Sequence, residues 1–189
     1  MENQANTEAE AVEEVPTASE EEHARGIHYD DAMLDAFVQK PEKFAWYKRT
    51  FAKFNRNGVD GFAWSWSWWA FFVTFWFLLY RKAYLAAIGY FGAALLFSFL
   101  SLGIIGTLIF MIISGGTAPY FVYKNYRELQ RRAEAASTDT EVRIETMKQL
   151  GGYHSWVVVV AAIINVLLLL GILLGFLALG VVLTSTSQG

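Results

Sequence analysis

The fold class is decided by one aromatic stretch without a charge before Arg81, which reads Gly61-Phe62-Ala63-Trp64-Ser65-Trp66-Ser67-Trp68-Trp69-Ala70-Phe71-Phe72-Val73-Thr74-Phe75-Trp76-Phe77-Leu78-Leu79-Tyr80-Arg81-Lys82. An apolar run close to ~20 residues is long enough to cross a bilayer as a helix. Tryptophan and tyrosine favour the headgroup level, and cations at a helix end anchor it there. The predicted membrane-interface residues are therefore Trp64, Trp66, Trp68, Trp69, Trp76, Tyr80, Arg81 and Lys82. We predict that residues 62–80 form a spanning helix, with a position in the interface as the alternative.

The composition outside this stretch also indicates a membrane protein. Only 17% of the 189 residues are charged, against about 25% in ordinary soluble domains. Residues 61–80, 83–123 and 149–189 contain no Lys, Arg, Asp or Glu. No separate basic domain offers a surface for nucleic acid, and the absence of cysteine excludes disulfides and thiolate metal sites. The sequence predicts an all-α integral membrane protein with about three transmembrane helices.

Charge and hydropathy divide the chain into five predicted parts. Residues 1–27 are an acidic tail that we expect to be disordered, because it carries too little apolar surface to fold. Residues 28–60 are predicted cytoplasmic or interfacial helices, and 61–123 form an aromatic-rich membrane region. Residues 124–152 are a charged cytoplasmic helical segment, and 153–189 are a C-terminal transmembrane helix with a short tail.

Two short helices are predicted before the aromatic stretch. The first helix is capped by Asp30 and runs to Val38. The second helix begins at Pro41 and is ended by Asn57-Gly58. One face of the second helix is aromatic (Phe44, Tyr47, Phe51 and Phe54), and basic residues surround it. Such a helix is suited to lie against anionic lipid, or to pack its aromatic face on the helix before it. Both interpretations stay open.

The order of motifs across this region resembles a known family. The motifs are Ala36-Phe37-Val38, Lys40-Pro41-Glu42-Lys43-Phe44, Phe51-Ala52-Lys53-Phe54, Trp68-Trp69-Ala70-Phe71-Phe72 and Phe75-Trp76-Phe77-Leu78-Leu79-Tyr80-Arg81-Lys82-Ala83-Tyr84. The chain resembles, over about residues 36–126, the small bacterial inner-membrane proteins grouped as domain of unknown function 2628. The resemblance implies a bacterial inner membrane and no particular activity. Val73-Thr74 stand where the family has Gly-Pro, and Ala83 stands in place of Met, so we expect a continuous helix here.

The uncharged run from 83 to 123 must contain a break, because a straight helix of that length would measure about 60 Å. The strongest predicted break is Ser114–Pro119, and the second candidate is Ser101–Gly103. Pro119 is then expected to begin a charged helix that ends near Ala136. Thr138 and Glu141 form a capping box for the next helix, which Gly151-Gly152 should close.

The last spanning helix is predicted over residues 156–183. Small residues and one amide share a face of it, and the predicted packing residues are Asn165, Gly171 and Gly175, with Ala161 and Ala178 on the same stripe. This face should contact either the helix over 61–80 or the same helix of a second copy.

Two topologies fit the distribution of positive charge, which favours the cytoplasm. Spans at 62–80, 85–113 and 156–183 leave 13 of the 15 basic residues inside, with Arg81 and Lys82 outside. A hairpin over 83–123, with 62–80 in the interface, leaves all 15 inside. We favour three spans, because a turn exposed to lipid is costly. Both topologies place the N-terminus in the cytoplasm and the C-terminus outside.

No catalytic, cofactor or metal-binding motif is recognisable. His23, His28 and His154 are scattered, and the uncharged segments carry no Asp, Glu, Lys or Arg for proton- or ion-coupled transport. We therefore expect a non-enzymatic membrane scaffold or partner-recruiting subunit without a cofactor; a small transporter or channel subunit is the alternative, and a membrane enzyme is a third hypothesis. The expected partners are the lipid bilayer, through anionic headgroups, and a second copy or another membrane protein, but not nucleic acid.

Overall fold

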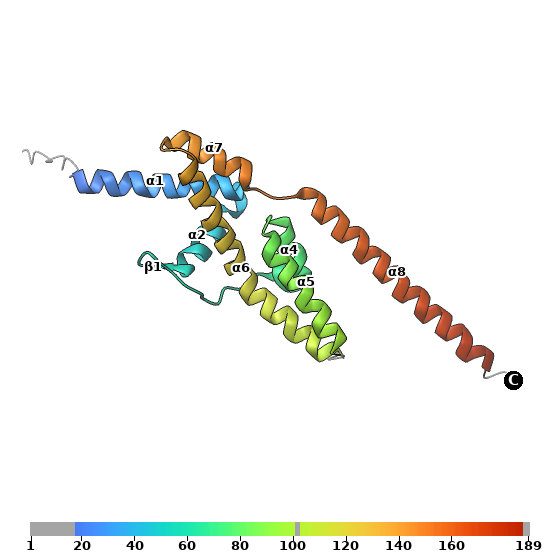
Figure 1. The fold of residues 1–189 in the computed structure, drawn as a ribbon. Helices are drawn as coiled ribbons and strands as arrows, with labels where there is room; N and C mark the ends of the chain where they lie inside the picture. The colour runs from blue at the N-terminus through green and yellow to red at the C-terminus, as the bar shows by residue number, and fades with distance from the viewer. Residues whose placement is uncertain (1–17, 101–102, 187–189) are drawn as a thin grey trace, which may run out of the picture.

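The computed structural model describes residues 18–100 and 103–186, in which helices account for most of the chain (Figure 1). The elements in order are α1 (Ala18–Val38), α2 (Pro41–Phe54), β1 (Asn55–Arg56), β2 (Val59–Asp60), α3 (Trp68–Val73), α4 (Phe75–Tyr80), α5 (Tyr84–Phe99), α6 (Gly103–Ala136), α7 (Thr140–Leu150) and α8 (Ser155–Thr186). The two strands form one antiparallel hairpin. The described residues are therefore mostly helical, as predicted, apart from this short hairpin.

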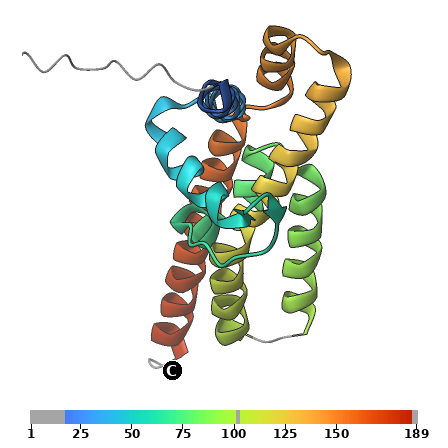
Figure 2. The same cartoon turned by 90° about the vertical axis from the view of Figure 1, so that its left-hand side faces the viewer.

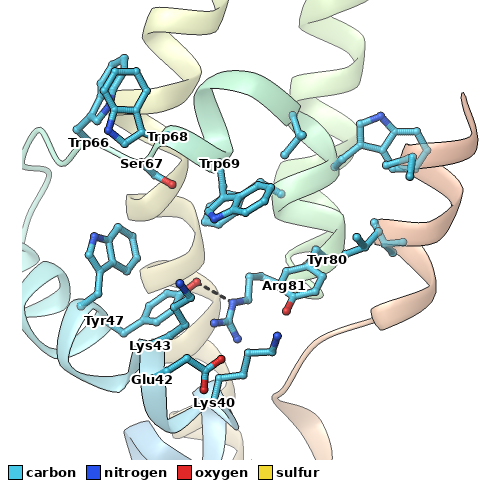
Figure 3. Close-up of a pocket in the computed structure, with 18 of the residues that line it drawn as sticks. Lys40, Glu42, Lys43, Tyr47, Trp66, Ser67, Trp68, Trp69, Tyr80 and Arg81 are labelled. Carbon is cyan, nitrogen blue, oxygen red and sulfur yellow. Dashed lines mark hydrogen bonds between the residues drawn. The ribbon is translucent and has the colours of Figure 1, made fainter. Parts of the chain in front are cut away.

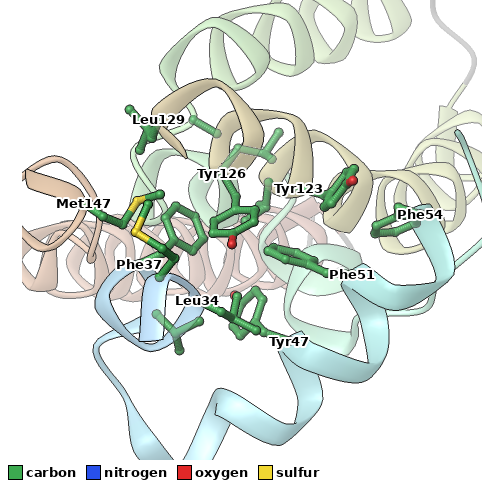
Figure 4. Packing of buried hydrophobic residues seen from close by; sticks show 14 of the residues in the cluster. Leu34, Phe37, Tyr47, Phe51, Phe54, Tyr123, Tyr126, Leu129 and Met147 are labelled. Atoms are coloured by element: carbon green, nitrogen blue, oxygen red, sulfur yellow. The ribbon is translucent and has the colours of Figure 1, made fainter. Parts of the chain in front are cut away.

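A helical module, which we define as α1, α2, α7 and residues 117–136 of α6, contains most of the buried core. Phe37 of α1 lies 5.3 Å from the ring of Tyr126 in α6, and Phe51 of α2 lies 5.2 Å from the ring of Tyr123. Met147 of α7 closes this aromatic cluster and is fully buried (Figure 4). The aromatic face of α2 therefore packs on α1 and α6, which confirms the packing interpretation of that helix.

Three apolar helices leave the module on the same side (Figure 2). α5 and the first half of α6 are antiparallel, since Phe97 contacts Phe110 at 5.4 Å while Tyr90 contacts Phe121 at 5.6 Å. α8 begins beside α4 and extends away from the module. Among the described residues, two helical stretches are long and apolar enough to cross a membrane by length and composition: Ile105–Ala136 of α6, and Thr140–Leu167, which covers α7 and the first part of α8.

The prediction of one helix across 85–113 is wrong. α5 ends at Phe99, where the Leu100 N–H still bonds to the Leu96 carbonyl, and α6 begins at Gly103, whose φ is +59°. Glycine adopts this left-handed conformation without the steric cost that a Cβ imposes. The second candidate break is therefore the observed one, and the hairpin over 83–123 is formed.

The prediction of a break at Ser114–Pro119 is also wrong, since α6 continues through it. Proline has no N–H to donate to the carbonyl four residues earlier. That carbonyl, on Gly115, instead accepts a hydrogen bond of 2.8 Å from the Ser67 N–H, and Gly116 O accepts one of 3.3 Å from the Ser65 N–H. The two glycines lack the Cβ atoms that would keep this segment away, so the motif is a docking groove on a continuous helix.

The aromatic stretch is not one helix, so the prediction for 62–80 is wrong. Residues 61–67 are extended along α6, and the Ser67 hydroxyl caps α3 by accepting from the Ala70 N–H. α3 ends at Val73, Thr74 between the helices has φ +40°, and α4 begins at Phe75. The helix therefore breaks at Thr74, at the position where Gly-Pro would break it in the family that this chain resembles. Our expectation of a continuous helix was wrong.

The other helix boundaries agree in part with the sequence predictions. α1 begins at Ala18, upstream of the predicted cap at Asp30, while residues 1–17 of the acidic tail lie outside the described residues. α2 begins at Pro41, and Asn57 and Gly58 form the hairpin turn, both with positive φ. The cap of α7 is Asp139, which accepts from the Glu141 N–H at 2.9 Å, rather than the predicted Thr138.

Candidate functional site

A cavity of about 720 Å³ lies where the module meets the apolar helices (Figure 3). This volume is typical of ligand pockets. Its walls include Lys40, Glu42, Lys43, Trp46 and Tyr47 around α2, Trp66 to Trp69 of the aromatic stretch, Trp76, Phe77, Tyr80 and Arg81 around α4, and Val157, Val158, Ala161, Ala162 and Asn165 of α8. The cavity therefore joins a charged end at the module to indole walls from the aromatic stretch and a mainly aliphatic wall from α8.

Arg81 is the most deeply buried charged residue of this site, with 2% of its surface exposed. Its Nε donates to the Tyr47 hydroxyl at 2.7 Å, and its Nη1 donates to the Val38 carbonyl at 3.0 Å. The guanidinium carbon also lies 4.4 Å from the centre of the Tyr47 ring. A cation over an aromatic face is stabilised by the ring quadrupole, so Tyr47 holds Arg81 in two ways.

The counter-charge of Arg81 comes from a helix end. Val38 is the last residue of α1, and unpaired carbonyls at a helix C-terminus carry a partial negative charge that favours cations. No carboxylate among the described residues lies within ion-pair distance of Arg81. Burial raises the pKa of the Tyr47 hydroxyl, so this acceptor stays a neutral phenol at physiological pH.

Three further charged residues surround the module end of the cavity. Lys40 places its Nζ 4.5 Å from the centre of the Tyr153 ring, and hydrogen bonding to Tyr80 raises the pKa of Lys40. Lys43 and Glu42 follow on the first turn of α2. Together with Arg81, this end holds three cations and one carboxylate, which favours an anionic ligand.

The far end of the cavity is formed by indole rings. Trp66 lies 5.3 Å from the ring of Trp68 in an edge-to-face arrangement. The Trp66 Nε1 is buried and has no hydrogen-bond partner among the described residues. Trp68 and Trp69 remain 64% and 67% exposed. Because Trp66 Nε1 is out of reach of solvent in the cavity, the exposed rings of Trp68 and Trp69 are the surfaces that a ligand can contact here.

A set of contacts beside the cavity fixes where α5 and α8 begin. The Tyr80 carbonyl accepts a hydrogen bond of 2.9 Å from the His154 N–H, and the Tyr84 hydroxyl lies 2.5 Å from His154 Nε2. Lys82 donates to the Gly151 carbonyl. These contacts place the start of α5 and the start of α8 at one level.

The structure brings most of the predicted interface residues to this cavity. Trp64 and Lys82 are the exceptions, since Trp64 packs on Gly116 of α6 and Lys82 donates to the Gly151 carbonyl. Asn165 lines the cavity, but its amide donates to Ala161 O of its own helix at 2.7 Å. Nothing lies within 4 Å of a Cβ built at Gly171, and Gly175 belongs to the same apolar helix.

The sequence analysis did not identify Lys40, Lys43 and Tyr47 as site residues. The signal for them was the basic aromatic helix, whose position beside Arg81 depends on the fold. Comparison of the chain with protein-family models, curated proteins and solved structures gives no match. The chemistry of the site therefore has to be argued from its geometry.

Proposed function

We propose that this chain is an integral protein of the bacterial inner membrane that displays the helical module in the cytoplasm as a non-enzymatic scaffold for partner proteins. The observation that carries the proposal is the division of the molecule into a packed, charged module and apolar helices that leave it on one side (Figure 2). The resemblance to domain of unknown function 2628 agrees with this location.

The helix lengths support a specific membrane placement. At about 1.5 Å per residue, the 32 residues of α8 extend for ~48 Å, enough to cross a hydrocarbon layer of ~30 Å. The 16 residues of α5 extend for ~24 Å, so the hairpin of α5 and α6 enters deeply from the module side. All 15 basic residues precede residue 149 and lie outside 83–123, so this placement leaves all of them in the cytoplasm.

The face offered to a partner is the charged surface of α7 and the end of α6. Glu128 pairs with Arg131 at 2.7 Å and with Arg132 at 3.0 Å, and Lys148 lies 3.9 Å from Glu145. Exposed ion pairs of this kind contribute little to stability, with a median of about 0–1 kcal/mol. These charges are therefore available for a protein partner without unfolding the module.

Site-specific photocrosslinking in the native membrane tests this proposal. A crosslinker at Arg132 or Glu145 should give a discrete protein adduct, while one at Ile109 or Leu170, which are exposed on the apolar helices, should give mainly lipid adducts. Resistance of the protein to alkaline carbonate extraction is the control for membrane insertion. Protein adducts only at Ile109 or Leu170 would overturn the proposal and favour a subunit that assembles within the bilayer.

The alternative, a small transporter or channel subunit, has less support. A polar path through the bilayer requires side chains that face a shared route. Asn165, in the apolar part of α8, bonds to a carbonyl of its own helix.

A further inference from the structure

We infer that the cavity between α2, the aromatic stretch, α4 and α8 binds one anionic phospholipid, with its phosphate at the Lys40–Lys43 end and its acyl chains along α8. The inference rests on the membrane placement proposed above. It goes beyond general attraction to a charged surface, because it assigns one lipid molecule to one built site.

The module end of the cavity is chemically suited to a phosphate. Lys40 and Lys43 stand at its edge, and the buried guanidinium of Arg81 lies behind them (Figure 3). Glu42 is the one carboxylate lining it. Only Nε and Nη1 of Arg81 donate to protein acceptors among the described residues, which leaves guanidinium N–H groups for a phosphate oxygen.

The opposite end is suited to the ester and acyl parts of the same molecule. Figure 3 shows Trp66 and Trp68 away from Lys40 and Glu42, and across the view from α8. A phospholipid carries ester groups between its phosphate and its chains, and the exposed rings of Trp68 and Trp69, which line the cavity, can contact them. Val158 and Ala162 of α8 then provide an aliphatic wall for the chains.

A lipid fits this arrangement better than a peptide or a second copy. The charged end belongs to the module and the apolar end continues onto exposed α8 residues such as Val166, which the proposed placement puts in the bilayer. One molecule must therefore be anionic at the interface and aliphatic below it. A phospholipid has this amphipathic order along its length.

Native mass spectrometry of the full chain in mild detergent, titrated with phosphatidylglycerol or phosphatidylcholine, tests the inference. One phosphatidylglycerol should be retained per chain, and phosphatidylcholine should not. Each basic residue near a membrane surface raises affinity for anionic lipid about fivefold. The variant Lys40→Gln with Lys43→Gln should therefore weaken binding about 25-fold. The control Lys53→Gln with Arg56→Gln removes two exposed charges outside the cavity and should leave binding unchanged.

A second pair of variants tests the acyl end without changing charge. Ala162→Trp should fill the cavity and abolish retention, whereas Ile163→Trp, at an exposed position of α8 outside the cavity wall, should not. This pair decides the question if the lysine variant fails to fold. The inference would be overturned if phosphatidylglycerol and phosphatidylcholine bind equally, or if a cavity variant and its matched control change lipid retention equally. Full displacement of the lipid by glycerol phosphate would also overturn it. Release of the protein by alkaline carbonate would instead refute the proposed membrane placement.

Discussion

Replacing Gly116 by alanine perturbs the place where the aromatic stretch meets α6. A Cβ built at Gly116 would lie 2.1 Å from Cζ2 of Trp64, far inside the usual carbon contact distance of about 3.5–4.0 Å. The indole is 53% exposed and has room to move outward, at the expense of its packing on the helix. Forcing extra volume into a packed site costs about 1–3 kcal/mol, while alanine gains about 0.8–1.0 kcal/mol over glycine in a helix. We expect a net loss of about 1 kcal/mol.

Gly92→Ala is the matched control for this prediction. Gly92 lies in α5 with nothing within 4 Å of a built Cβ, so alanine should stabilise the protein by about 1 kcal/mol through helix propensity alone. The two variants should therefore differ by about 2 kcal/mol in the free energy of unfolding, measured by equilibrium denaturation in mild detergent.

A double-mutant cycle shows whether the cost arises from the indole. With Trp64→Ala already in place, Gly116→Ala should become neutral or stabilising, because the clashing ring is gone. A variant Gly116→Ala that is as stable as Gly92→Ala, or a cycle without coupling, would refute the close approach and the docking groove with it.

Three further predictions follow from the same contacts. Arg81→Gln should lower the free energy of unfolding by about 2–3 kcal/mol, because a buried carbonyl and phenol lose a charged donor; an unchanged denaturation midpoint would contradict this. Burial raises the pKa of Tyr126, so its contribution to stability is full below pH ~10 and is lost as the pH rises through the folded pKa; in alkaline titrations Tyr126→Phe should reduce that loss. In this cysteine-free chain, a cysteine at Ser137 should react with an impermeant thiol reagent only after permeabilisation, whereas one at Ser187 should react in intact cells; the reverse pattern would overturn the topology.

The parts of the fold that depend on local patterns were predictable from the sequence. The spacing of Tyr47, Phe51 and Phe54 places three rings on one face of a helix, and Pro41 and Asn57-Gly58 mark its ends. α8 was equally plain, because a long uncharged run has few other structures available to it. In each case the residues that decide the structure are neighbours in the chain.

The parts that failed depend on contacts between distant segments. Gly115, Gly116 and Pro119 are signals of a helix break when read alone, and Ser65 and Ser67 give no sign that their N–H groups bond to α6. The docking groove forms only when the serine segment packs on the glycine segment, and the two lie about 50 residues apart in the chain. The cavity was hidden for the same reason, since its charged end and its aromatic end come from separate elements that only the fold brings together.

The break at Thr74 explains how the aromatic stretch connects the membrane region to the module. A straight helix over 62–80 would carry Arg81 about 28 Å from its start, across most of the hydrocarbon layer. In the observed path, residues 61–67 follow α6 away from the module and α4 returns, so Arg81 reaches the C-terminus of α1. A guanidinium is costly in hydrocarbon, and bonds to Val38 O and Tyr47 hold it at the module, which makes the returning path the favourable one. The cavity is the space that this returning segment leaves between α2 and α8, so the anchoring of Arg81 and the existence of the site have one structural cause.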